Sequence, residues 1–462
     1  GVLHADAFEP MCMTTSAALP GGDMEAVSED CLYLNMWTPK SPRGHKLPVM
    51  VYVYGGKLRG GSASSPVYWG DKLVERGVIT VNLSYRVGVF GFLSHPDLSR
   101  ESGYDASGNY GIMDMIAALT WVKQNISAFG GDPNNVTVFG QSAGSLSLSY
   151  LMASPLATGL FHRVIGQSGA DMNPIGEGMK HLADAEASGV RFAQRLGAHS
   201  VAALRLMPAD QIVTADAQWP MDARGTVEPG TLTVLDGHVF TETVYDRFMH
   251  GLQNDVPLLI GYNADEGTTY LPHPLAGRVF AESVRQQYGE LADEILKVYP
   301  PMPEDISVRS QRRLLRDNWY GWHMWTWARL QSRTGKGKVY LYEFSHTTSF
   351  PEGSPLHGMG AAHGAELIFT FGHTNYLPKT ATADDIRMVE TMASYWTNFA
   401  KTGDPNGAGL PVWPDFNERD PRVMNLGEPL RATPIDPTDL QGLQLQDRYI
   451  ATLRPAPLVR PQ

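Results

Sequence analysis

The feature that most constrains the fold is an apolar strand that runs directly into a glycine-flanked serine. Val136-Thr137-Val138-Phe139 is typical of a buried strand, and Gly140-Gln141-Ser142-Ala143-Gly144 follows it without a break. In such a G-x-S-x-G turn the glycines leave room for the neighbouring strand and helix, while the serine adopts a strained conformation that lifts its hydroxyl above the sheet. The segment therefore predicts a nucleophilic serine at a strand-to-helix turn, with the Ala143 N–H directed toward a developing oxyanion.

Apolar runs alternate with helical patterns along the rest of the chain. Helical spacing of apolar residues from Ile112 to Ile126 predicts an amphipathic helix that stops before Gly130-Gly131-Asp132-Pro133. Further strands are expected at 47–54, 78–83, 163–166, 256–260 and 338–342. This alternation implies a mostly parallel sheet with helices on both faces. We expect one large α/β domain over residues 1–462, with segments 170–250 and 270–330 forming helical insertions above the sheet.

Composition excludes several classes of protein. The net charge of -11, from 37 basic and 48 acidic residues, argues against a nucleic-acid binder. The chain has no apolar run of 18 residues, so no membrane span is expected. Neither metal-ligand spacing nor a nucleotide-binding glycine loop occurs, so we predict no metal and no cofactor.

Several ordered motifs carry a resemblance to a known family. They are Glu29-Asp30-Cys31-Leu32-Tyr33-Leu34-Asn35, Ser84-Tyr85-Arg86-Val87-Gly88-Val89-Phe90-Gly91-Phe92-Leu93, Gly108-Asn109-Tyr110-Gly111, the run from Ala128 to Thr137, Gln167-Ser168-Gly169-Ala170 and Tyr395-Trp396-Thr397-Asn398-Phe399-Ala400. Together with the serine turn, they resemble the type B carboxylesterases, the group of cholinesterases and para-nitrobenzyl-type esterases. The resemblance implies an α/β-hydrolase fold and serine esterase activity.

The resemblance also implies the partners of Ser142. The family's acid lies in an Asp-Glu-Gly motif, which corresponds to Asp265-Glu266-Gly267, and its base lies in His-Gly-x-Glu, which corresponds to His363-Gly364-Ala365-Glu366. We therefore expect Glu266 to orient His363, the general base. Asp265 is the competing acid, and His357 and His373 are the competing bases.

A turn with two cations bears on the substrate. The family's oxyanion turn corresponds to Tyr54-Gly55-Gly56-Lys57-Leu58-Arg59, so Gly56 and Lys57 are expected to join Ala143 as N–H donors. Two interpretations of the Lys57 and Arg59 side chains stay open: they point to solvent, or they bind an acidic acyl group. The second, with Tyr54 and Gln141 as further contacts, favours esters of polycarboxylic acids such as tricarballylate, the fumonisin type. Gln141 replaces the family's usual glutamate, which weakly favours the same interpretation; simple drift explains it equally well.

Other residues are expected to play supporting parts. The resemblance places Ser168 behind the triad as a hydrogen-bonded group, although a plain turn serine is as plausible. An aromatic cluster from 319 to 327 is interpreted as core packing, with a pocket wall as the alternative: Trp319, Tyr320, Trp322, Trp325 and Trp327.

Two features concern the start of the chain. The two cysteines, Cys12 and Cys31, are expected to form a disulfide, which together with the resemblance favours a secreted or periplasmic protein. Family members begin with a hairpin and a Gly-Ile-Pro-Tyr-Ala segment ahead of the region matching 1–10, so an N-terminal hairpin is expected to be lacking.

The predicted function is a serine carboxylic-ester hydrolase that acts through an acyl-enzyme on a small-molecule ester. The alternatives are a general short-chain carboxylesterase and a non-catalytic, cholinesterase-like adhesion protein. The sequence leaves the oligomeric state undetermined.

Overall fold

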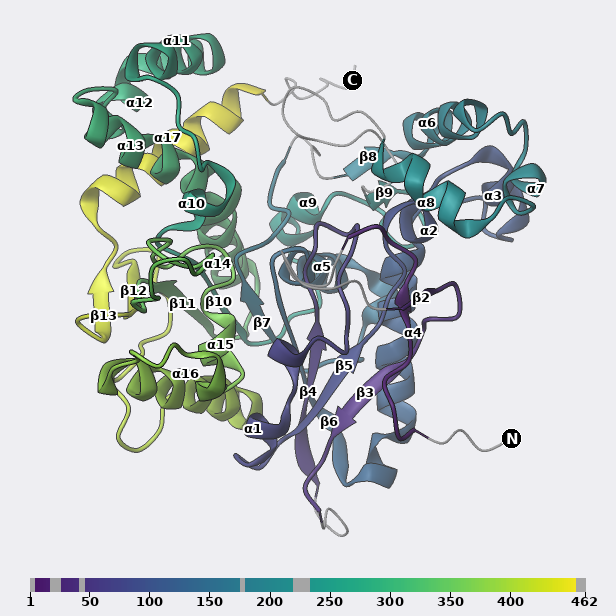
Figure 1. The fold of residues 1–462 in the computed structure, drawn as a ribbon, viewed down its shortest axis with the longest axis horizontal. Coiled ribbons are helices and arrows are strands. Elements are labelled where there is room, and N and C mark those ends of the chain that lie inside the picture. Colours follow the sequence, from purple (N-terminus) through teal and green to yellow (C-terminus); the bar gives the residue numbers. More distant parts are fainter. Residues whose placement is uncertain (1–4, 17–25, 41–45, 175–178, 219–232, 454–462) are drawn as a thin grey trace, which may run out of the picture.

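A single large sheet forms the centre of the molecule. The computed structural model describes residues 5–16, 26–40, 46–174, 179–218 and 233–453. Within these ranges, nine strands form a sheet in the order β13-β12-β11-β10-β7-β6-β4-β5-β3 (Figure 1). Their bounds are β3 (Leu34–Trp37), β4 (Leu47–Val53), β5 (Ile79–Leu83), β6 (Gly131–Gln141), β7 (Arg163–Gln167), β10 (Leu258–Asn263), β11 (Val339–Phe344), β12 (Arg422–Leu426) and β13 (Arg431–Pro434).

The inner strands of this sheet are parallel, as predicted. Every pairing from β5 across to β12 is parallel, and only the edge strands β3 and β13 pair antiparallel to their neighbours. Strand β6 begins earlier than predicted, because Gly131, which was expected to lie in a helix-breaking turn, already pairs with Leu47 of β4. Gly130, with φ 85°, still ends the preceding helical segment.

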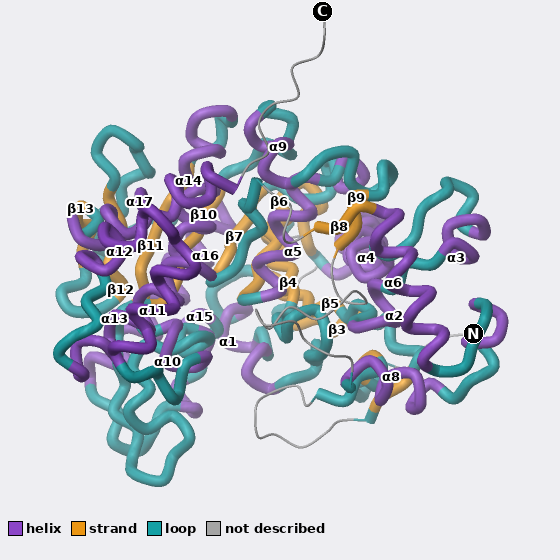
Figure 2. The backbone as a smooth tube through the Cα atoms, turned by 90° about the horizontal axis from the view of Figure 1, so that it is seen from above, coloured by secondary structure: helices purple, strands orange, loops and turns teal. Residues whose placement is uncertain are grey.

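Helices cover both faces of the sheet. In Figure 1, α16 (Ala383–Thr402) lies in front of the strands, whereas α4 (Tyr110–Asn125) and α14 (Trp322–Thr334) lie behind them. Figure 2 shows the sheet from above, between these layers. The strands that helices enclose are buried throughout: every residue of β5 and β10 is buried. This explains why the inner strands are continuous apolar runs and not alternating ones.

The long segments after β7 and β10 are largely helical, as expected. The first contains α6 (Leu182–Arg195), α7 (Val201–Leu204), α8 (Ala209–Ala217) and α9 (Val244–Met249), with a small β8 (Met179–His181) and β9 (Thr233–Leu235) pair. The second contains α10 (Glu266–Tyr270), α11 (Gly277–Tyr288), α12 (Ala292–Val298) and α13 (Glu304–Arg316). In Figure 1, α6 to α8 and α11 to α13 lie in the upper half of the molecule, on either side of α5 (Ala143–Ala153).

The remaining α-helices and β-strands of the described chain lie outside these groups. They are α1 (Asp71–Val74), α2 (Gly88–Phe92), α3 (Pro96–Glu101), α15 (Leu367–Thr370), α17 (Pro437–Leu453), and a parallel pair of β1 (Met11–Cys12) and β2 (Val27–Ser28). Cys12 and Cys31 form the predicted disulfide and are both buried. Among the helices of the described residues, none combines the length and hydrophobicity needed to cross a bilayer.

Candidate active site

Ser142 lies where β6 meets α5, in a strained backbone conformation. Its φ is 58°, a left-handed value that costs a non-glycine residue about 1–3 kcal/mol unless the surroundings hold it. The Ser142 N–H donates to the Gln167 carbonyl of β7, at 2.8 Å. The turn also requires its glycines, because a Cβ on Gly144 would lie 2.0 Å from the Val53 carbonyl oxygen. The predicted strand-to-helix turn is therefore present.

Glu266 and His363 form a close acid–base pair. Glu266 begins α10, directly after β10, and is fully buried. Its Oε2 lies 2.6 Å from His363 Nδ1, and its Oε1 accepts the Asn263 N–H at 2.9 Å. A carboxylate on Nδ1 fixes the imidazole so that Nε2 is the nitrogen free to accept a proton.

The imidazole Nε2 is occupied by Gln141. The Gln141 side-chain nitrogen lies 3.1 Å from His363 Nε2, where an amide N–H can donate to the neutral ring. His363 Nε2 is thus engaged with a neighbouring side chain, and catalytic contacts of this kind often tighten only when substrate binds.

The turn after β4 lies against the serine. A Cβ on Gly55 would be 2.9 Å from Ser142 Cβ. Neither the Gly56 N–H nor the Lys57 N–H donates a hydrogen bond to any described residue. Ala143 is the first residue of α5, where backbone N–H groups have no intrahelical acceptor. The N–H groups of Gly56, Lys57 and Ala143 therefore have no backbone acceptor in the described part of the chain.

Two tyrosines and a lysine form one wall of the site. The Tyr320 ring stacks on His363 at 4.8 Å between ring centroids, and the Tyr270 ring lies 5.3 Å from the same imidazole. Burial raises the pKa of Tyr270, and hydrogen bonds from the Tyr320 and Ser142 hydroxyls oppose that rise. Lys57 Nζ lies 5.4 Å above the Tyr270 ring, a cation–π contact that holds an ammonium beside the site.

Two of the four predicted substrate contacts need correction. Arg59 neither reaches solvent freely nor faces the serine: its side chain is 18% exposed and pairs with Asp216 at 3.2 Å. Tyr54 is buried beneath the turn, where it stacks on Tyr85 and donates its hydroxyl to the Tyr85 carbonyl. Both side chains therefore hold the turn in place: Arg59 through its Nη2 contacts with Asp216, and Tyr54 through its hydroxyl.

A comparison with known protein families identifies the family of this chain. The model of the carboxylesterase family matches residues 1–441. The chain belongs to the carboxylesterase family. It is accordingly a hydrolase of carboxylic esters. The predicted α/β-hydrolase fold is confirmed by its similarity to the solved structure of PNB esterase, with a TM-score of 0.79 and 32% identity. The match covers 96% of this chain and 90% of the PNB esterase chain.

Named relatives of this carboxylesterase include bacterial and human enzymes. It is 35% identical to fumonisin B1 esterase of Sphingopyxis macrogoltabida over 91% of this chain and 77% of that protein. It is also 35% identical to para-nitrobenzyl esterase of Bacillus subtilis strain 168, over 90% and 83%. Carboxylesterase 3 of Homo sapiens is 34% identical over 90% and 76%.

The competing acid and bases lie elsewhere in the carboxylesterase. Asp265 accepts the Ala361 N–H at 2.9 Å and so holds the loop that carries His363. His357 Nδ1 lies 2.8 Å from the Phe350 carbonyl, and His373 packs beside Phe371. Ser168 is buried, but its Oγ has no hydrogen-bond partner among the described residues, so the expected hydrogen bond behind the triad is absent.

A second buried carboxylate stands behind the acid. Glu366 accepts hydrogen bonds from the Asn263 and Gln167 amides, at 2.5 and 3.2 Å. Burial, reinforced by the negative charge of Glu266, raises the pKa of Glu366 to about 7. Glu366 therefore carries a proton over part of the neutral range, behind the Glu266–His363 pair.

The aromatic cluster divides between two roles. Trp322, Trp325 and Trp327 are core residues, as predicted. A π-helical turn, Asp317–Gly321, instead directs Tyr320 to His363 and places the half-exposed Trp319 5.1 Å from Tyr270. Tyr270 was not predicted from the sequence, although it follows Glu266 by four residues and so lies on the same face of α10.

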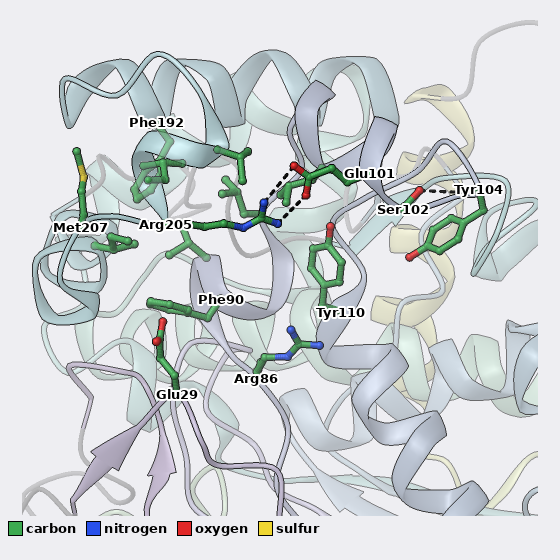
Figure 3. Close-up of a pocket in the computed structure, with 16 residues that line it drawn as sticks. Glu29, Arg86, Phe90, Glu101, Ser102, Tyr104, Tyr110, Phe192, Arg205 and Met207 are labelled. Carbon is green, nitrogen blue, oxygen red and sulfur yellow. Dashed lines mark hydrogen bonds and ion pairs between the residues drawn. The ribbon is translucent and has the colours of Figure 1, made fainter.

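A separate cavity lies away from the serine. It has a volume of about 540 Å³ and is bordered by α2, α3, α4 and α6 to α8 (Figure 3). The Arg205 and Glu101 side chains meet across it as an ion pair, and Tyr110 points toward them. None of Ser142, Glu266 and His363 lines this cavity, so it is distinct from the candidate active site.

Proposed function

We propose that Ser142, His363 and Glu266 hydrolyse carboxylic esters through an acyl-enzyme. The observation that carries the assignment is the 2.6 Å contact of Glu266 with His363, beside a serine held at φ 58°. In the first step Ser142 Oγ attacks the ester carbonyl while His363 Nε2, leaving the Gln141 amide, accepts the hydroxyl proton. The alcohol departs with that proton. Water then attacks the acyl carbonyl and gives a proton to His363, which returns it to Ser142 Oγ as the bond to the serine breaks and the acid leaves.

The three unpaired N–H groups support this mechanism. Gly56, Lys57 and Ala143 are proposed to donate to the oxygen that becomes negative in each tetrahedral intermediate. Because they are fixed in place before the reaction, they require no reorganisation when charge develops, and each such donor is worth about 3 kcal/mol.

The triad assignment is tested by two substitutions and a covalent probe. Ser142→Ala and His363→Ala should each lower kcat by about 10⁴-fold or more, because the units of a triad act together. A fluorophosphonate should label the wild-type protein on Ser142 and leave Ser142→Ala unlabelled. Labelling at another serine would show that the assignment is wrong.

For the substrate, we propose esters of di- and tricarboxylic acids, the class to which tricarballylate esters belong. The support is the Lys57 ammonium above Tyr270, next to the serine, together with a neutral Gln141 that adds no negative charge to repel a carboxylate. A relative that is a fumonisin B1 esterase agrees with this class. The second candidate, a neutral short-chain ester, is favoured by the aromatic wall of Tyr270, Tyr320 and Trp319.

The substrate proposal is tested at Lys57. Lys57→Asn removes the charge and tolerates the left-handed backbone of this position, where φ is 58°. We expect kcat/KM for a tricarballylate monoester to fall about 10-fold, because one charge-assisted contact is lost. The kcat/KM for para-nitrophenyl butyrate should stay within about twofold of the wild-type value. Lys297→Asn, an exposed lysine on α12, is the matched control. Equal losses on both esters would exclude charge recognition by Lys57.

We also propose a secreted or periplasmic location, from the Cys12–Cys31 disulfide. Thiol titration of the unfolded, non-reduced protein isolated from its native compartment should find no free thiol. Two reactive thiols would remove the argument.

A further inference from the structure

The turn that carries the oxyanion donors is strained at consecutive residues. Gly56 has φ 117°, Lys57 φ 58° and Leu58 φ 59°. Side chains disfavour this left-handed region, so two successive non-glycine residues persist there only where the surroundings fix them. The direction of the Gly56 and Lys57 N–H groups therefore depends on what holds the turn from outside.

The turn is anchored directly behind the strained residues. The Leu58 carbonyl accepts the Gly88 N–H at 2.7 Å, and the Thr14 hydroxyl donates to the Arg59 carbonyl at 2.7 Å. The Arg59 side chain adds the charged contact: its Nη2 donates to the Asp216 carbonyl at 2.6 Å and lies 3.2 Å from the Asp216 carboxylate.

Asp216 belongs to the last turn of α8 and is 4% exposed. Its carboxylate also accepts the Val89 N–H of α2, at 3.4 Å. The approach is close: a Cβ on Gly88 would lie 2.5 Å from Asp216 Oδ2, so a side chain there would displace the carboxylate. Burial raises the pKa of Asp216 while Arg59 opposes that rise. One carboxylate thus joins α8, the start of α2 and the oxyanion turn.

The packing around α8 gives this contact weight. Ile212 of α8 packs with Val89 and Phe90 of α2, and the same three residues border the 540 Å³ cavity, so this apolar contact has open space on one side. The ion pair is the charged attachment of α8 to the turn.

We propose that the Arg59–Asp216 pair positions the oxyanion turn, so that α8 controls the orientation of the Gly56 and Lys57 N–H groups. Arg59 and Asp216 are positioning residues and do not bind substrate. The inference rests on the proposed function, in which those N–H groups stabilise the oxyanion.

The experiment compares Asp216→Asn, Arg59→Met and the double variant on a neutral ester, para-nitrophenyl butyrate. Each single variant should lower kcat about 10- to 100-fold, which is no more than the fall in kcat expected when one oxyanion donor is removed. KM should stay within about twofold of the wild-type value. The double variant should lose no more than the worse single variant, because both substitutions break the same contact. Affinity for a trifluoromethyl ketone, which forms an oxyanion on Ser142, should fall by the same factor as kcat.

The controls separate positioning from damage to the fold. Arg247→Met breaks another ion pair of an 18% exposed arginine, with Glu242, and should leave kcat within about twofold. Arg59→Lys keeps the charge and should recover part of the lost kcat. The concentration of active sites in each variant is measured by fluorophosphonate titration, so that every kcat refers to folded enzyme.

Two outcomes would overturn the inference. One is an unchanged kcat per titrated site in both single variants. The other is a rise in KM for a tricarballylate monoester with no change in kcat or in KM for the neutral ester. That result would show that Arg59 binds the substrate. Failure of the proposed function looks different, since fluorophosphonate would then not label Ser142 in the wild-type protein.

Discussion

At the scale of single residues, Gln141 has the most direct effect on the chemistry. It precedes the nucleophile and places its amide 3.1 Å from His363 Nε2. An amide N–H can donate to that nitrogen in the unprotonated ring, the form that a general base requires. A glutamate at this position, the family's usual residue, would instead pair with the imidazolium.

Gln141→Glu should therefore move the acid limb of the kcat/KM profile to higher pH, by about one unit for a carboxylate at this distance. It should also lower kcat/KM for an anionic ester more than for a neutral one. Gln141→Met, which removes the amide without adding charge, should give the smaller pH shift. The measurement is a pH–rate profile for both esters. Identical profiles in the glutamate and methionine variants would contradict this account of Gln141.

At the scale of elements, the ends of adjacent strands assemble the site. Strands β4, β6, β10 and β11 are parallel, so the oxyanion turn, Ser142, Glu266 and the loop with His363 all follow the carboxyl ends of the strands. Polar groups collect at that edge of a parallel sheet because the chain leaves it there. The close packing of the elements depends on glycines at their contacts.

Gly169→Ala tests that packing. Gly169 follows β7, and a Cβ there would lie 2.2 Å from the Ser142 carbonyl oxygen, a backbone atom that cannot move without displacing the turn. We expect kcat to fall at least about 10-fold, because displacements of about 1 Å cost catalysis heavily, together with a lower Tm. Gly321→Ala, whose nearest atom would be an Asp317 carboxylate oxygen at 3.3 Å, is the control and should stay close to wild type. Calorimetry and initial rates measure both effects.

At the scale of the whole molecule, stability depends on buried groups that join separate segments of the chain. His323 of α14 accepts the Met172 N–H at its Nδ1, 3.1 Å away, and so joins the helix to the segment after β7. Burial lowers the pKa of His323 from 6.5 to about 4. The folded state therefore prefers the neutral ring, while the unfolded chain binds a proton below pH 6.5.

This contribution to stability is complete above pH 6.5 and is lost as the pH falls toward 4. A single group changes the free energy of unfolding by at most about 1.4 kcal/mol per pH unit. We therefore expect the free energy of unfolding of His323→Asn to depend less steeply on pH between 6.5 and 4, with a slope smaller by up to that amount. Urea unfolding at several pH values measures it. A variant with an unchanged slope would show that His323 titrates normally in the folded protein.

The sequence predicted much of this protein because the relevant signals are local. The inner strands 47–54, 136–139 and 163–166 are apolar runs, and the serine turn is fixed by glycines two residues on either side. The positions of Glu266 and His363 came from motifs in a family resemblance, and the structure brings these two residues together. The edge strands β3 and β13 were missed, since their partly exposed residues give a weaker pattern, and β12 beside β13 was missed as well.

Tertiary structure decided which side chains are available to a substrate. Lys57 and Arg59 are both cations of one turn, yet Lys57 lies over Tyr270 while Arg59 is held by Asp216, 157 residues further along the chain. Tyr270 and Tyr320 likewise meet at His363 from separate helical segments. Local sequence determines which strands and turns form, because backbone preference and hydrophobic period act over a few residues. The partner of a charged or aromatic side chain depends on contacts between distant segments, which only the folded chain creates.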